Sequence, residues 1–275
     1  MSEGRGQRLS WATEADGLCT LRLHGEPLNE LGEESLGELE SFLERLGEPT
    51  REGHLPAIRA LLIVSEQPRG FCAGADLRAL QARVAASEDA SALRAPLRSF
   101  LIRINAALSG LDQAPIATAA AVEGLCFGGG LELALACDMI VADPTARFGF
   151  PELRLGLIPG FGGITRLRRA LGSQRVLDLL LTGRSLNAER AREAGLVSQV
   201  SGKGQAARAA ARALRQTLRV PSAAVAAAKR HAKPHDPGAI AAEIETFLAL
   251  FERPECAQAL ADFVSRTDLL PYTPR

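Results

Sequence analysis

The chain has 275 residues, 47% hydrophobic and 23% charged, a composition typical of a folded globular protein and not of a disordered or fibrous one. Its 32 Lys and Arg residues balance 32 Asp and Glu residues, and a net charge of zero argues against a dedicated binder of nucleic acid or of anionic lipid. The five cysteines form no Cys-x-x-Cys pair, and the sequence has neither a signal-peptide core nor an 18-residue apolar run, so we expect a cytoplasmic protein with no metal site and no membrane span.

The first part of the chain predicts a hairpin, a helix and a buried strand. Residues 8–14 and 18–23 flank Asp16-Gly17, a pair typical of a two-residue hairpin turn. Between residues 33 and 46 apolar side chains recur at helical spacing, and Gly47 and Pro49 end the pattern. Residues 57–64 are almost wholly apolar, as in a strand that is covered on both faces.

The middle of the chain predicts a parallel α/β layer. Two more apolar runs lie at residues 116–122 and 139–142, and residues 128–137 between them indicate a helix that begins at a glycine-rich turn. A strand, a helix and a strand in this order are typical of parallel pairing. Residues 81–94 are polar and rich in small side chains, so both a lid and a loosely ordered helix remain open for them.

Beyond Pro159 the pattern becomes helical. Gly and Pro residues separate candidate helices at residues 167–171, 174–181, 188–194, 206–218, 222–231, 238–251 and 254–265. We therefore expect a core domain over residues 1–200 and a C-terminal helical domain over residues 201–275.

Three segments concentrate glycine and isolated carboxylates: GFCAGAD at 70–76, GLCFGGGLE at 124–132, and FGFPE at 148–152 leading into GLIPGFGG at 156–163. Glycine lets a ligand approach the backbone, and a helix start offers unpaired N–H groups that suit negative charge on an oxygen. The nucleotide-binding motifs do not fit, because the glycine triplet lacks the Lys-Ser/Thr of a P-loop and Gly160-Phe-Gly162 follows a proline and not a strand. Each segment alone is also explained by a tight strand-to-helix turn.

Together, however, the segments resemble the crotonase family, the enoyl-CoA hydratase/isomerase superfamily. The matching motifs are Pro27-Leu-Asn29, Ala73-Gly-Ala-Asp76, Gly128-Gly-Gly-x-Glu132, Cys137-Asp138, Phe148-Gly-x-Pro-Glu152, Gly156-x-x-Pro-Gly160 and Gly162-Gly163. Their order and spacing are specific, and they cover most of residues 20–200. The resemblance implies a spiral of ββα units with a C-terminal helical trimerisation domain and a homotrimer or hexamer. It also implies an acyl-CoA thioester as substrate, with no cofactor besides the CoA that the substrate carries.

The resemblance also assigns an oxyanion hole to the backbone N–H groups of Ala75 and Gly129. Fixed amides stabilise the charge that develops on a thioester oxygen during reaction at the α- or β-carbon. Contacts with the acyl-CoA fall on neighbouring residues: Ala73, Gly74, Asp76, Leu77, Arg78 and Gly128. Two of these have simpler explanations from the residues alone, with Asp76 organising its loop by accepting backbone N–H bonds and Arg78 lying in solvent at a helix start.

Glu132 and Glu152 coincide with the two carboxylates that hydratases of this family use. By analogy, Glu132 is the base that activates water and Glu152 the acid that protonates the α-carbon, whereas isomerases generally need only the carboxylate at the Glu152 position. Read without the resemblance, Glu132 complements a helix N-terminus and Glu152 is a surface carboxylate. Cys72 and Cys126 flank these segments with no histidine nearby in sequence, so we expect them to pack as small hydrophobic residues.

The resemblance thus implies an enoyl-CoA hydratase, which adds water reversibly to a trans-2-enoyl-CoA to give a 3-hydroxyacyl-CoA. The alternatives are an enoyl-CoA isomerase or acyl-CoA decarboxylase of the same fold, and a non-catalytic RNA-binding relative. The last rests on four arginines on one predicted helix face, for which a solvated face is the commoner explanation: Arg208, Arg212, Arg215 and Arg219. Phe150 replaces a residue that is polar in many hydratases, and we expect it to make the acyl pocket more apolar. The residues from 254 to 275 depart from the family pattern.

Overall fold

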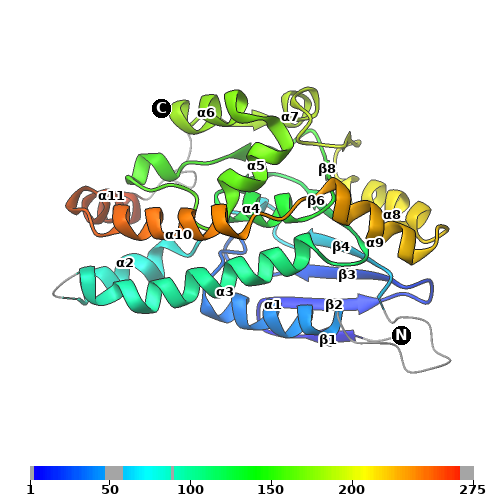
Figure 1. Cartoon of the computed structure of the whole chain (residues 1–275), viewed down its shortest axis with the longest axis horizontal. Coiled ribbons are helices and arrows are strands. Elements are labelled where there is room, and N and C mark those ends of the chain that lie inside the picture. Colours follow the sequence, from blue (N-terminus) through cyan, green and yellow to red (C-terminus); the bar gives the residue numbers. More distant parts are fainter. Residues whose placement is uncertain (1–2, 47–57, 88–89, 267–275) are drawn as a thin grey trace.

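The computed structural model describes residues 3–46, 58–87 and 90–266, which form two sheets and an outer layer of helices (Figure 1). Within these residues the larger sheet has seven strands in the order β1-β2-β3-β4-β6-β8-β11. Their bounds are Glu3–Arg5, Leu9–Thr13, Leu18–Leu23, Ala60–Ser65, Ala117–Val122, Met139–Ala142 and Gln199–Val200. β1 to β3 pair antiparallel, and each pair from β3 onward is parallel. The predicted hairpin and parallel layer are therefore confirmed; Ala57, in the predicted buried strand, lies outside the described residues.

The smaller sheet has four strands in the order β10-β9-β7-β5. Their bounds are Leu186–Asn187, Arg147–Gly149, Leu125–Phe127 and Gly70–Cys72. β5, β7 and β9 pair parallel and lie inside or directly before the glycine-rich motifs. Strands of three residues are too short to show a strand periodicity, and the sequence did not predict this sheet. Because parallel strands end at the same edge, the sheet brings the three segments together.

The chain alternates between the two sheets, and this alternation is the ββα spiral that the resemblance implies. β4 and β5 lead to α2 (Leu77–Ala85), β6 and β7 lead to α4 (Gly129–Ala136), and β8 and β9 lead to a short 3-10 helix, η2 (Glu152–Leu155), and then to α5 (Gly163–Leu171). Each unit thus places one strand in each sheet and a helix start at the same edge.

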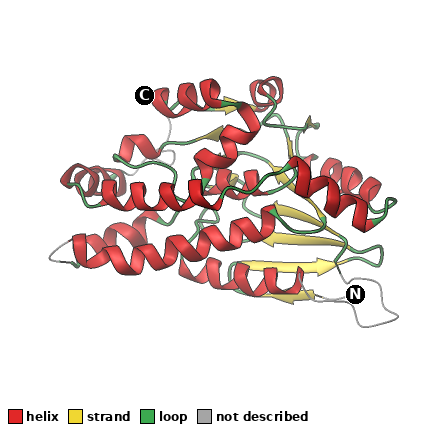
Figure 2. Ribbon diagram, viewed as in Figure 1, coloured by secondary structure: helices red, strands yellow, loops and turns green. Residues whose placement is uncertain are grey.

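Two long helices cover the front of the spiral. α1 (Glu33–Leu46) has the predicted bounds, whereas α3 (Arg94–Asp112) was not predicted. The segment at 81–94 resolves into the end of α2 and a 3-10 turn, η1 (Ala90–Leu93), that leads into α3. Leucines 97, 101, 108 and 111 of α3 are buried at helical spacing. In Figures 1 and 2 α1, α3 and α10 lie side by side across this face.

The remaining helices agree closely with the sequence. They are α6 (Ser173–Thr182), α7 (Ala188–Ala194), α8 (Ala206–Thr217), α9 (Ser222–Ala232), α10 (Pro237–Phe251) and α11 (Pro254–Ser265). α8 packs its alanine-rich face on β4, β6 and β8 of the large sheet. α10 contacts α3 and α5, and α11 contacts α2 and η2, so the chain returns to the edge where the glycine-rich segments meet. The division at residue 200 and the trimer remain predictions.

Among the described residues, no helix combines the length and the apolar character that crossing a membrane requires.

Candidate active site

A cavity of about 130 Å³ lies at the shared edge of the strands, under α2, α3 and α10. It is lined by every residue of the predicted site except Arg78: Ala73, Gly74, Ala75, Asp76, Leu77, Gly128, Gly129, Glu132 and Glu152. The spiral therefore brings all three glycine-rich segments to one cavity, although they lie far apart in the sequence.

Two backbone N–H groups at this cavity lack acceptors within the described residues. Leu31 donates to Gly74 O at 2.8 Å and accepts from Asp76 N at 3.1 Å, a parallel bridge in which the N–H of Ala75 faces away from Leu31. Gly129 begins α4, and its N–H has no intrahelical acceptor. The groups are close, because a Cβ added to Gly129 would lie 3.4 Å from Ala75 N. They can both donate to one ligand oxygen.

Glycine is required where these strands turn into helices. Gly74 has φ of +108° and Gly128 has φ of +50°, a region that other residues rarely adopt. A Cβ on Gly128 would also lie 2.6 Å from Oε1 of Glu152. The turn therefore places the Glu152 carboxylate directly against the backbone beside the two N–H groups.

Glu132 lies in the first turn of α4 and is 1% exposed. Its Oε1 accepts hydrogen bonds from Phe161 N and Gly163 N, both at 2.7 Å. Glu132 thus complements a helix N-terminus, as the explanation from sequence alone has it, and that helix is α5. Burial raises the pKa of Glu132 well above its usual value, and the nearby Glu152 raises it further, whereas the bond from Phe161 lowers it.

Glu152 has the opposite surroundings. It begins η2 and is half-buried, but its Oε2 is buried with no hydrogen-bond partner among the described residues. Burial raises the pKa of Glu152 to about 8. It is therefore not a surface carboxylate. The pKa values of both carboxyls are thus raised, and the two N–H bonds that Glu132 accepts favour its ionised form.

The rest of the cavity wall is mostly apolar, with Glu33 and Arg83 as charged exceptions, and much of it comes from elements that the sequence did not assign to the site. These apolar residues are Leu80 of α2, Leu97, Phe100 and Leu101 of α3, Phe247 of α10, and Phe161. The Phe100 and Phe161 rings lie 6.0 Å apart, edge to face. The leucine spacing at 97 and 101 was the signal that could have revealed this wall.

Phe150 does not contribute as expected. Its side chain is 1% exposed, packs in the main hydrophobic core, and is not among the residues that line the cavity. The expectation that it shapes the acyl pocket is wrong, because its place directly after β9 turns the ring into the core and not toward the cavity.

A second, more polar groove of about 640 Å³ adjoins the cavity and shares part of its wall. Charged residues of both signs line it: Arg8, Arg69, Arg78 and Arg266, with Glu26, Glu30 and Asp76. Arg78 thus lies beside the cavity and not in it. Asp76, at the border of the two, caps α2 by accepting from Ala79 N at 2.9 Å, which is the loop-organising contact predicted for it.

Other polar groups have structural roles. All five cysteines are buried, and burial raises the pKa of Cys72 to about 12, so this thiol packs as expected and is no nucleophile at neutral pH. In the arginine row of α8, Arg215 pairs with Glu14 and Asp16 at 2.5 and 3.0 Å. That pairing weakens the case for a basic RNA-binding face.

Comparison with known proteins identifies the family of the chain. The sequence profile described as enoyl-CoA hydratase/isomerase matches residues 13–269. The human mitochondrial methylglutaconyl-CoA hydratase is 41% identical over 56% of this chain and 43% of its own length. The enoyl-CoA isomerase/hydratase fer4 of Mycosarcoma maydis is 39% identical over 59% of this chain and 56% of its own. The chain thus spans about half the length of these curated relatives.

Solved structures share the fold over nearly the whole chain. An enoyl-CoA hydratase from Bacillus halodurans superposes with a TM-score of 0.80 at 23% identity, covering 93% of this chain and 100% of its own. An enoyl-CoA hydratase/isomerase from Xanthobacter autotrophicus Py2 gives 0.78 at 26% identity, covering 93% and 92%. With the two converging carboxylates and paired N–H groups at its cavity, the chain belongs to the enoyl-CoA hydratase/isomerase family.

Proposed function

We propose that this protein is an enoyl-CoA hydratase that adds water to the 2,3 double bond of a trans-2-enoyl-CoA. The observation that carries the proposal is the pair of carboxylates at one cavity, Glu132 held by two N–H donors and Glu152 with none for its buried oxygen. An ionised group beside a protonated one is what a hydration needs, since one must take a proton and the other must give one.

The acyl and CoA parts of the substrate match the cavity and the adjoining groove in chemical character. The acyl group enters the apolar cavity, and the phosphates of CoA lie in the groove with the four arginines, where guanidinium groups suit phosphate oxygens. The thioester oxygen accepts from the N–H groups of Ala75 and Gly129 at the border of the two. Leu77 and the glycines beside these donors, Gly74 and Gly128, flank the thioester.

In the reaction Glu132 takes a proton from water as the water oxygen bonds to the β-carbon. The electrons of the double bond move onto the thioester oxygen, where the two N–H groups stabilise the charge. The enolate then returns its electrons to the α-carbon, which takes the proton of Glu152. Glu132 now carries the proton taken from water, and Glu152 has given its own proton to the α-carbon, so one proton transfer from Glu132 to Glu152 resets the site. CoA enters with the substrate, and this mechanism needs no separate cofactor.

An enoyl-CoA isomerase is the second candidate, and the raised pKa of Glu152 favours it as a proton shuttle. The test is to measure hydration and isomerisation on the wild-type protein. Loss of the conjugated enoyl-thioester absorbance is followed with short and branched 2-enoyl-CoAs, and its appearance is followed with a 3-enoyl-CoA. Hydration without isomerisation supports the proposal, whereas isomerisation with no hydration at any chain length contradicts it.

The assembly and location remain separate proposals. The trimer or hexamer is tested by light scattering, for which a monomer is the contrary result. The cytoplasmic location also remains a prediction, and the human relative is named as mitochondrial.

A further inference from the structure

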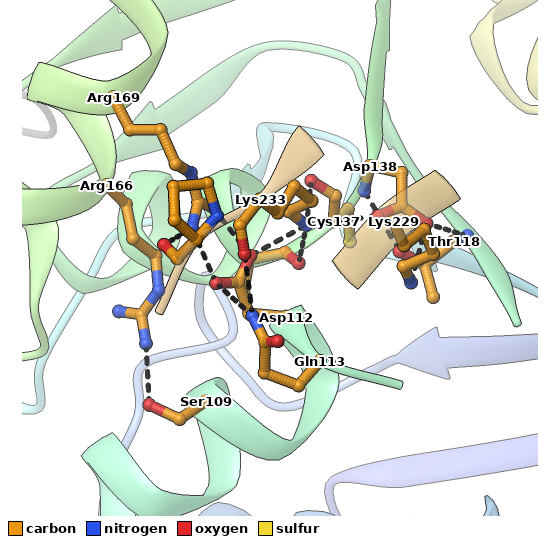
Figure 3. Close-up of polar contacts among 12 residues, drawn as sticks. Ser109, Asp112, Gln113, Thr118, Cys137, Asp138, Arg166, Arg169, Lys229 and Lys233 are labelled. Carbon is orange, nitrogen blue, oxygen red and sulfur yellow. Dashed lines mark hydrogen bonds and ion pairs between the residues drawn. The ribbon is translucent and has the colours of Figure 1, made fainter. Parts of the chain in front are cut away.

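The turn that binds Glu132 is itself held by a buried arginine. Arg166 of α5 is 1% exposed. Its Nη1 donates to Phe161 O at 2.5 Å and its Nη2 to Ser109 Oγ at 3.1 Å, the latter drawn in Figure 3. Its Nε is buried and has no hydrogen-bond partner within the described chain. Burying a guanidinium with so few partners is costly, which indicates that the residue has a role besides packing.

These contacts fix the backbone that carries the donors to Glu132. Asn105 donates to Gly160 O at 2.8 Å. This carbonyl belongs to the peptide between Gly160 and Phe161, whose N–H donates to Glu132. Arg166 donates to Phe161 O, the carbonyl of the next peptide. The peptide after that one carries the N–H of Gly163, which also donates to Glu132. The arginine therefore holds the one peptide that lies between the two N–H donors.

The charge of Arg166 is not neutralised by a direct ion pair in the described residues. Its hydrogen-bond partners are a carbonyl and a hydroxyl. Nearby Asp112 is bound by Arg169 and Lys233, as Figure 3 shows, and Glu243 of α10 accepts from Ile164 N and Thr165 N. The positive charge of Arg166 can therefore act on the carboxylate of Glu132, which is bound by the turn at residues 161–163.

Five charged groups besides Glu132 act on the pKa of Glu132 or of Arg166. Glu152 from η2 and Glu243 from α10 raise the pKa of Glu132, and Arg166 from α5 lowers it. Burial lowers the pKa of Arg166, Asp112 of α3 and Glu243 raise it, and Arg169 of α5 lowers it. Of these groups, all within the described residues, Arg166 favours the ionised form of Glu132.

We propose that Arg166 is a positioning residue for Glu132, which fixes the turn whose N–H groups bind the carboxylate. The role of Arg166 in fixing the turn rests on the hydrogen bonds alone, whereas its expected effect on the reaction rate rests on the proposed function. Arg166 contacts neither the cavity nor the reacting atoms, so its action passes through the turn.

The test compares Arg166→Met, Arg166→Lys and the matched control Arg169→Met. Methionine removes the positive charge and the paired N–H donors of the guanidinium, whereas lysine keeps the charge on a side chain long enough to reach Phe161 O. Arg169 lies on the same helix and pairs with Asp112 without contacting the turn. The readouts are the pH profile of kcat and, independent of activity, the carbon-13 NMR titration of the Glu132 carboxyl, assigned by its loss in Glu132→Gln.

We expect Arg166→Met to raise the pKa of Glu132 and to move the acid limb of the kcat profile to higher pH. Its kcat falls on the order of 100-fold, the usual cost of a catalytic group misplaced by about 1 Å, with KM little changed. Arg166→Lys keeps the pKa near that of the wild type and loses less rate. Arg169→Met lowers the melting temperature and leaves both profiles in place.

An unchanged Glu132 titration in Arg166→Met, or equal shifts in Arg166→Met and Arg169→Met, overturns the inference. If Arg166→Met does not fold, Arg166→Lys decides alone: a kcat no lower than that of Arg169→Met contradicts the role. If the wild type hydrates no substrate, the proposed function fails, yet the NMR titration still tests the effect of Arg166 on Glu132.

Discussion

The two sides of the cavity hold identical side chains in opposite surroundings. On one side the N-terminal turn of α5 donates two backbone N–H groups to Glu132, and on the other no group of the described chain donates to the buried oxygen Oε2 of Glu152. Both carboxylates are desolvated, and both pKa values are raised. What separates them is the pair of N–H bonds that Glu132 accepts from the turn before α5, so the proposed difference between acid and base lies in backbone amides of another glycine-rich segment.

The largest effect we expect comes from removing each carboxylate in turn. Glu132→Gln should reduce hydration by about 100-fold or more, because no group takes the proton from water. It should retain exchange of the α-proton, which needs only Glu152 and the oxyanion hole. Glu152→Gln should lose both activities. Comparing hydration with deuterium exchange at the α-carbon checks this, and equal loss of exchange in the two variants contradicts the division of roles.

A single methyl group should disturb the Glu132 side selectively. A Cβ on Gly163 would lie 2.6 Å from Glu132 Oε1, and Gly163 has no positive φ that would forbid alanine. Gly163→Ala should therefore displace the carboxylate and lower kcat on the order of 100-fold with the fold retained.

The control for this variant is Gly110→Ala, where an added Cβ meets nothing within 4 Å in helix α3. It should leave kcat unchanged and stabilise the protein by about 0.5–1 kcal/mol, because alanine favours a helix over glycine. A wild-type rate in Gly163→Ala would mean that the position of Glu132 does not matter.

The protonated state of Glu152 should set the alkaline limit of activity. Since its folded-state pKa is about 8, kcat/KM for hydration should fall as the pH rises through that value. Rates measured from pH 5 to 10 check this. A rate that stays constant well above pH 8 would remove Glu152 from the role of acid.

The smallest effect concerns stability. The Glu152 carboxyl has its ordinary pKa of 4.5 when unfolded and about 8 when folded, so between these pH values the unfolded chain releases a proton that the folded chain keeps. Wild-type stability from this group is complete below pH 4.5 and is lost as the pH rises to 8. Glu152→Gln lacks this loss, so its melting temperature should exceed that of the wild type by a margin that grows across the window. A constant margin contradicts the buried, protonated acid.

The same contrast shows what the sequence could predict. The motifs at Ala73–Asp76 and Gly128–Glu132 indicated the cavity, because each holds its glycines and its carboxylate within a few residues of one another in the sequence. They could not indicate that Glu132 binds N–H groups 29 and 31 residues away, since that pairing depends on how α4 and α5 meet in space. α3 was missed although its leucines at 97, 101, 108 and 111 recur at helical spacing.

The central claim is that the proton of the carboxylate pair resides on Glu152 and not on Glu132. Infrared spectroscopy of the substrate-free protein at pH 7 tests it directly, because a buried protonated carboxyl has a carbonyl stretch distinct from that of a carboxylate. We predict that the band assigned to this pair is present in the wild type, persists in Glu132→Gln and disappears in Glu152→Gln. Its disappearance in Glu132→Gln with persistence in Glu152→Gln would contradict the account.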